Sequence, residues 1–267
     1  MKNGALVFLA ALIALGSSWV GFVLAPTLQL GGQKQTVVLN GTDAYPIQRT
    51  GDATLGLQVY RANGCASCHT EQVRQDGFAC QVNLTDAGKN PAVVSNLIAS
   101  LKLEGLNHEQ AESVSDKITA AGGKSETRLV ATGGDINRGW GVRQSVAADY
   151  LYDYPVQLGN LRAGPDLANI GFRHSDLKWQ LLHLYAPKSV TANSSMPSFR
   201  YLFEVRKIAG TAPSADALDL PKEFAPADGS EVVPTEAARQ LAAYLMSLRA
   251  NVPLYEAPFT PVTTAKP

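Results

Sequence analysis

Two cysteines and a histidine stand close together in the segment Cys65-Ala66-Ser67-Cys68-His69. Two thiols three residues apart on a helical turn can each form a thioether with a vinyl group of haem. The adjacent imidazole can then bind the iron from one side. The spacing therefore predicts one covalently bound haem c, with His69 as the proximal axial ligand.

Two other interpretations use the same residues. A Cys-x-x-Cys pair can be a redox dithiol, but that chemistry does not need the histidine that follows. A zinc site would combine three thiolates with one imidazole, from Cys65, Cys68, His69 and Cys80. Haem is favoured because the chain also offers residues for the other half of a haem site.

A six-coordinate haem iron needs a second axial ligand, and the chain has three methionines. Met196 stands in the turn-rich segment 193–197, where a thioether can be held rigidly over the haem. Met1 is the first residue, and Met246 belongs to an apolar helical run. Thioether ligation also raises the potential relative to two histidines. We therefore predict Met196 as the ligand; the alternatives are an open iron position, as in a gas sensor, or His108, His174 and His183.

Two further features could support the haem. Ligating histidines usually donate their second ring N–H to a carbonyl or carboxylate, and the Pro165 carbonyl in the turn 164–167 is the candidate acceptor. An ordinary Gly-Pro helix start explains that turn equally well. Haem propionates need charged or hydrogen-bonding partners. The candidates are Arg138, Arg143 and Arg162, although solvated arginines would explain these residues too.

The composition shows what kind of protein positions these residues. The 267 residues carry 23 basic and 23 acidic side chains, so the chain lacks the basic excess of a nucleic-acid binder. A hydrophobic content of 45% excludes wholesale disorder. Charged residues make up 17%, against about 25% in soluble domains. This deficit indicates that part of the chain lies outside water.

The N-terminal segment explains the deficit, because residues 3–33 contain no charge. Residues 4–25 are apolar and are followed by Pro26, and as a helix they would be roughly 33 Å long, enough to cross a hydrocarbon core of about 30 Å. The apolar core of a signal peptide is usually only about 7–15 residues long. We therefore expect a retained transmembrane anchor over 1–30. Lys2 places the N-terminus in the cytoplasm and the remainder outside it.

The remaining chain divides into a linker over 31–50, a haem domain over 51–253 and a C-terminal tail over 254–267. A helix carrying Tyr60 precedes the Cys-x-x-Cys-His motif, and residues 235–248 form an amphipathic helix. If these two helices cross, they close a small all-α haem fold. The stretch 81–133 is predicted to be an α/β insertion, with Cys80 as a structural or incidental thiol at its entrance. Its helices begin at Pro91 and Asn107, and its strand covers 127–130.

With these residues in hand, the chain resembles the membrane-anchored monohaem cytochrome c subunit (subunit II, or O subunit) of cbb3-type haem-copper oxidases. The resemblance covers 5–80 and 134–253. It rests on short blocks in the family's order, at 25–30, 60–74, 138–141, 149–155, 161–171, 183–187, 195–199 and 244–245. The stretch 81–133 departs from the family's pattern.

The resemblance implies a mainly α protein with one N-terminal transmembrane helix and a class I-like cytochrome c domain that carries the insertion. Cys65 and Cys68 would be thioether sites, and His69 and Met196 the axial ligands. The subunit would pass electrons to the haem-copper catalytic subunit, beside a dihaem cytochrome c subunit, in a bacterial inner membrane with its haem on the periplasmic side. Oxygen would be reduced by the complex and not by this chain.

The other functions compatible with these residues are an anchored cytochrome c of a nitric oxide reductase or another respiratory complex, and a zinc- or thiol-based membrane-tethered binding module. The first alternative keeps the haem and changes the complex. The second removes the haem altogether.

Overall fold

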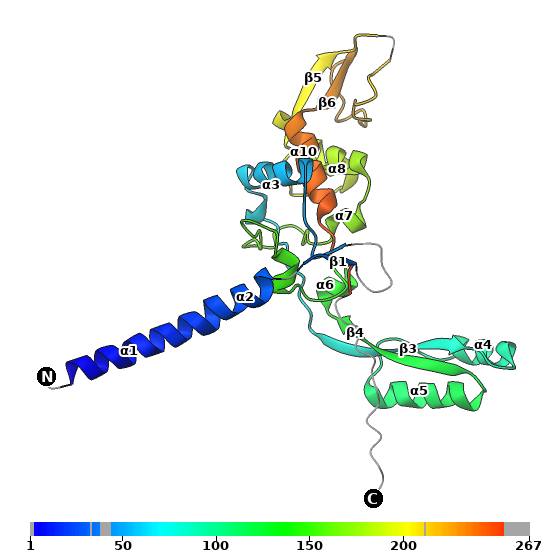
Figure 1. Cartoon of the computed structure of the whole chain (residues 1–267). Helices are drawn as coiled ribbons and strands as arrows, with labels where there is room; N and C mark the ends of the chain where they lie inside the picture. Colours follow the sequence, from blue (N-terminus) through cyan, green and yellow to red (C-terminus); the bar gives the residue numbers. More distant parts are fainter. Residues whose placement is uncertain (1–2, 33, 38–43, 211, 254–267) are drawn as a thin grey trace, which may run out of the picture. The chain divides into compact units, whose positions relative to one another are not determined.

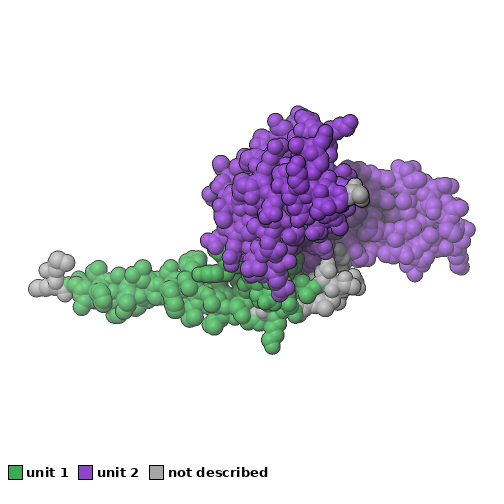
Figure 2. All heavy atoms as spheres, turned by 90° about the horizontal axis from the view of Figure 1, so that it is seen from above, with its two compact units in different colours: residues 1–49, 146–156 green, residues 50–145, 157–267 purple. Residues whose placement is uncertain are grey.

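The computed structural model describes residues 3–32, 34–37, 44–210 and 212–253. The expectations for Lys2 and for the tail 254–267 fall outside these residues. The chain forms two compact units, which Figure 2 colours separately. Unit 1 comprises residues 1–49 and 146–156, and unit 2 comprises residues 50–145 and 157–267.

One continuous helix forms the N-terminal part of unit 1. It consists of α1 (Gly4–Trp19), a π-helical segment η1 (Val20–Leu24) and α2 (Ala25–Gly31). By length and composition this helix could cross a membrane. The helix continues past Pro26 and ends at Gly31. The wider π turn immediately before Pro26 accommodates a residue that has no N–H and would otherwise clash with the preceding turn.

The rest of unit 1 joins the predicted linker to a later part of the chain. It contains β1 (Thr36–Val37), which pairs antiparallel with β2 (Ala44–Tyr45), and the 3-10 helix η3 (Ala147–Tyr150). The Tyr45 hydroxyl donates to the Asp149 carboxylate at 2.9 Å, and Arg49 forms an ion pair with Asp153. Residues 146–156, which the sequence places in the haem domain, therefore pack with the segment that follows the anchor.

Two crossing helices form the centre of unit 2. The helices of this part are α3 (Asp52–Ala62), α7 (Ile170–Arg173), α8 (Leu177–Tyr185) and α10 (Glu236–Ser247). α10 packs against α3, α8 and α7 (Figure 1). At the crossing of α3 and α10, a Cβ on Gly56 would lie 1.9 Å from the Gln240 carbonyl oxygen, so only glycine fits there. The rings of Tyr60 and Tyr244 are 5.1 Å apart. The predicted crossing of the two helices is confirmed.

Short elements complete this part of unit 2. They are the 3-10 helices η2 (Cys65–Ser67) and η4 (Arg200–Leu202), the helices α6 (Gly134–Asn137) and α9 (Pro187–Val190), and the strands β5 (Phe203–Lys207) and β6 (Ser230–Pro234). The two strands pair antiparallel, with Phe203 opposite Pro234. The prediction of an all-α haem domain did not include this hairpin, although the described part of the chain is mostly helical.

The predicted α/β insertion is present and has a hydrophobic core of its own. It runs through β3 (Gly77–Asp86), α4 (Pro91–Ala99), α5 (His108–Ala120) and β4 (Lys124–Thr132), and β3 pairs antiparallel with β4. Both helices begin where the sequence predicts, and Asn107 and Gln110 form the expected capping box. The strand predicted over 127–130 is part of β4. β3 was not predicted, and because of it the insertion begins before residue 81.

Candidate functional site

The Cys-x-x-Cys-His motif forms a single helical turn directly after α3. Gly64 enters this turn with φ +67°, a conformation that favours glycine. The backbone N–H groups of Cys68 and His69 donate to the Cys65 carbonyl at 3.1 and 3.0 Å. Both cysteines are free thiols, Cys65 half-buried and Cys68 exposed. The two thiols therefore share one turn, as two thioether bonds to a single haem require.

The His69 ring is oriented by the loop that contains Gly164 and Pro165. Its Nδ1 lies 2.8 Å from the Pro165 carbonyl oxygen, which is the contact predicted from the sequence. A Cβ on Gly164 would lie 2.3 Å from Cε1 of His69, and one on Gly159 would lie 2.1 Å from the His69 carbonyl oxygen. The loop can approach the histidine this closely only because both positions are glycine.

The same contact defines which nitrogen of His69 can bind a metal ion. A carbonyl oxygen can only accept, so Nδ1 of His69 carries the proton and donates it to Pro165. Burial lowers the pKa of His69, while the hydrogen bond to the Pro165 carbonyl opposes that shift. A lowered pKa keeps the imidazole neutral at pH 7, with Nε2 unprotonated. A neutral imidazole with a bare Nε2 is the form that coordinates iron.

Met196 lies between α9 and η4 and packs, partly buried, against the core formed by α3, α8 and α10. Cys65 and Ala66 border the same core. The end of the Met196 loop is anchored by the Phe199 N–H, which donates to the Leu184 carbonyl at 2.9 Å. Two residues from distant parts of the sequence, Cys65 and Met196, thus border one hydrophobic core.

The histidines considered as alternatives to Met196 have other surroundings. The His174 and Trp179 rings stack with centroids 3.7 Å apart, and Trp179 and His183 stack at 4.9 Å. Burial lowers the pKa of His183 to about 4. The fourth histidine, His108, begins α5 of the insertion. His183 therefore contributes to local packing on α8.

The zinc alternative finds no support in the geometry. Cys80 is buried in the core of the insertion, where its N–H donates to the Leu106 carbonyl at 2.8 Å. No group of three or more His, Cys, Asp or Glu residues that could hold a metal ion occurs among the residues that the structure describes. Burial also raises the pKa of the Cys65 thiol to about 12, which opposes formation of the thiolate that zinc requires.

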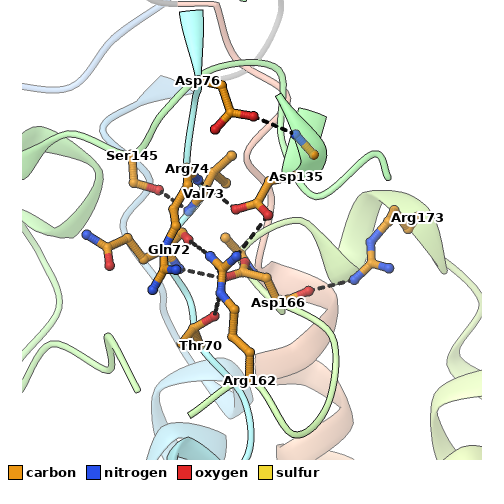
Figure 3. A network of polar contacts seen from close by, with 12 residues as sticks. Thr70, Gln72, Val73, Arg74, Asp76, Asp135, Ser145, Arg162, Asp166 and Arg173 are labelled. Carbon is orange, nitrogen blue, oxygen red and sulfur yellow. Dashed lines mark hydrogen bonds and ion pairs between the residues drawn. The ribbon is translucent and has the colours of Figure 1, made fainter. Parts of the chain in front are cut away.

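A network of polar contacts centred on Arg162 includes Thr70, the residue that follows His69 (Figure 3). Arg162 is at its centre and donates from Nε to Thr70 Oγ1 at 2.9 Å, from Nη1 to Asp135 at 2.8 Å and from Nη2 to the Gln72 carbonyl at 2.6 Å. Nη2 is also 3.4 Å from Asp166. Arg162 was one of three arginines considered as partners of a haem propionate. In the structure its guanidinium donates to protein acceptors.

The remaining arginines differ in their contacts. The Arg138 guanidinium lies 5.0 Å from the Trp140 ring centroid, and the side chain of Arg143 donates to the carbonyls of Val252 and Gln144. Sequence reasoning missed Thr70, Asp135 and Asp166. Arg162 and Asp166 pair within a loop and not on a helix, so the helical spacing rule for ion pairs gave no signal for this contact.

These residues fit a covalent haem c. Two free thiols on one turn match the two thioether bonds, and the oriented, neutral imidazole of His69 matches an axial ligand. Met196 adds a soft thioether on the same core as Cys65.

Comparison with known proteins supports this fit. No curated protein sequence is significantly similar to the chain. The model of the family described as "Cytochrome C oxidase, mono-heme subunit/FixO" matches residues 135–226, a segment that includes Arg162, Pro165 and Met196. The Cys-x-x-Cys-His motif precedes this segment. Over residues 135–226 the chain is thus similar to the mono-haem subunits of cytochrome c oxidase, which confirms the resemblance predicted from its motifs.

Proposed function

We propose that this chain is a membrane-anchored monohaem c-type cytochrome that relays electrons to the haem-copper catalytic subunit of a cbb3-type terminal oxidase. The observation that carries the proposal is the orientation of His69, whose Nδ1 donates to Pro165 beside two free thiols on the same helical turn. The similarity over 135–226 to mono-haem oxidase subunits gives the complex in which such a site would work.

Each site residue has a distinct task in this proposal. Cys65 and Cys68 would hold the haem covalently, and His69 and Met196 would bind its iron. The iron, when bound, supplies one-electron chemistry between its ferric and ferrous states. Pro165 fixes the tautomer of His69 and raises the basicity of its coordinating nitrogen. The thioether of Met196 favours the ferrous state relative to a second histidine, which suits transfer toward an oxidant.

The N-terminal helix supports a location at a membrane. Residues Gly4–Gly31 form a helix that is apolar enough to span a bilayer, and its large apolar side chains are exposed. We propose that it anchors the protein in the inner membrane of a bacterium with the haem on the periplasmic side. The proposed partners are the haem-copper catalytic subunit and the dihaem cytochrome c subunit of the oxidase.

The test is purification of the native complex in detergent, followed by a pyridine haemochrome assay, identification of the subunits and a copper determination. We expect haem c attached to this chain and a copper-containing catalytic subunit in the same complex. Haem c together with a catalytic subunit that lacks copper would assign the chain to a nitric oxide reductase or another complex. A chain without covalent haem would refute the proposal and leave a thiol-based module.

A further inference from the structure

The polar network centred on Arg162 connects two segments that are far apart in the sequence. One segment is 70–72, which directly follows the Cys-x-x-Cys-His motif, and the other is 162–166, which carries Pro165. Arg162 donates to Thr70 and Gln72 in the first segment and pairs with Asp166 in its own. The fourth partner of Arg162, Asp135, accepts from the Arg74 N–H at 2.8 Å and thereby extends the connection.

Asp166 is the most deeply buried member of this network. Its side chain is 0% exposed, and it accepts from the Thr70 hydroxyl at 2.5 Å and from the Gln72 N–H at 2.9 Å. A buried carboxylate is tolerated only when hydrogen bonds and an opposite charge compensate for lost hydration. Arg162 supplies that charge. Removing one of these partners would leave a buried group unsatisfied, so the geometry of the two segments is tightly specified.

The network is adjacent in sequence to both residues of the His69–Pro165 hydrogen bond. Thr70 is the residue after His69, and Asp166 is the residue after Pro165. In both segments, the Thr70–Asp166 hydrogen bond therefore lies one residue after the His69–Pro165 hydrogen bond. The His69–Pro165 hydrogen bond is 2.8 Å long, so a displacement of about 1 Å between the two segments would break it.

We propose that Thr70, Arg162 and Asp166 are positioning residues that hold the Pro165 carbonyl on Nδ1 of His69 and thereby keep the potential of the haem iron low. The inference rests on the proposed function. Donation from Nδ1 raises the basicity of the coordinating nitrogen, and a more basic ligand favours ferric iron. Loosening the network weakens that donation, so the midpoint potential of the haem rises.

The test uses substitutions that leave the formal charge unchanged, because loss of a nearby positive charge would by itself lower the potential. Thr70→Val removes the hydroxyl that bridges Arg162 and Asp166, while Thr70→Ser keeps it. Arg162→Lys keeps the charge but cannot reproduce the planar fork of the guanidinium.

The measurements are made on the full chain in its purified complex. They are the covalent haem content, the midpoint potential and the electron paramagnetic resonance g-values of the ferric haem. We expect a more positive potential and altered g-values in Thr70→Val and Arg162→Lys. Thr70→Ser, the matched control, should retain wild-type values.

The two proposals fail in different ways. Wild-type chain without covalent haem would refute the proposed function. Haem-loaded Thr70→Val with wild-type potential and g-values would refute the positioning role and leave the proposed function intact. If Thr70→Val fails to retain haem, Arg162→Lys decides on the same two readouts. A fall in potential in Arg162→Lys would also overturn the inference.

Discussion

The close approach of Gly164 to His69 allows a test of the haem site with one added methyl group. In Gly164→Ala the new Cβ would lie 2.3 Å from Cε1, 2.8 Å from Nδ1 and 3.0 Å from Nε2 of His69. Carbon atoms pack at about 3.5–4.0 Å, so the ring and the loop must separate by more than about 1 Å. Nδ1 and the Pro165 oxygen, now 2.8 Å apart, would then lie beyond hydrogen-bonding distance.

The expected cost has two parts. Overpacking costs about 1–3 kcal/mol, and loss of the hydrogen bond costs about 0.5–1.5 kcal/mol. We therefore expect Gly164→Ala to destabilise the folded protein by roughly 2–4 kcal/mol. If about 1 kcal/mol of the hydrogen-bond energy distinguishes ferric from ferrous haem, the midpoint potential rises by about 40 mV, since 59 mV corresponds to a tenfold change for one electron.

The assay compares Gly164→Ala with Gly77→Ala in the purified complex. Gly77 lies at the start of β3, and its added Cβ would meet Thr132 Oγ1 at 3.7 Å, an ordinary contact. Thermal unfolding and redox titration should be altered in Gly164→Ala and unchanged in Gly77→Ala. Wild-type stability and potential in Gly164→Ala would refute the argument that this loop orients His69.

Three further predictions concern the rest of the chain. Gly56→Ala would place a Cβ 1.9 Å from the Gln240 carbonyl oxygen, so we expect a loss of at least about 3 kcal/mol in chemical denaturation; a loss below 1 kcal/mol would contradict the close helix crossing. Ile118→Ala leaves a cavity at a fully buried position in the core of the insertion and should cost about 2–5 kcal/mol in local stability, measured by hydrogen exchange. The haem spectrum should stay unchanged, and a changed spectrum would show that the insertion supports the haem site. Burial lowers the folded-state pKa of His183 to about 4, so its neutral form contributes stability above pH 6.5 that is lost as the pH falls toward 4. Unfolding measured as a function of pH should show this loss of stability in the wild type and a smaller loss in His183→Gln. Equal losses in the two proteins would contradict the prediction.

Features encoded locally could be predicted from the sequence. The Cys-x-x-Cys-His turn, the apolar span and the two helices of the insertion depend on residues within a few positions of one another. The capping box at Asn107 is an example, because its two hydrogen bonds involve residues three apart. The amphipathic pattern of 235–248 also indicated a buried face, and Tyr244 on that face does pack against Tyr60.

Features that depend on distant pairing could not be predicted in the same way. Strand β3 pairs with β4, and Cys80 lies opposite Leu129, about 50 residues later in the chain. The network at Arg162 is assembled from three separate segments, and no local pattern indicates that Asp135 lies beside it. From the sequence, Arg162 could therefore be considered only by its charge, as one candidate partner of a haem propionate. The π turn immediately before Pro26 is not visible in the sequence either.

Intact-mass spectrometry of the denatured chain tests the central claim most directly. Two thioether bonds survive denaturation, so the account predicts a mass that exceeds the sequence mass by one haem, and loss of that increment when Cys65 and Cys68 are both replaced by alanine. A wild-type chain whose mass equals that of its sequence would contradict the account.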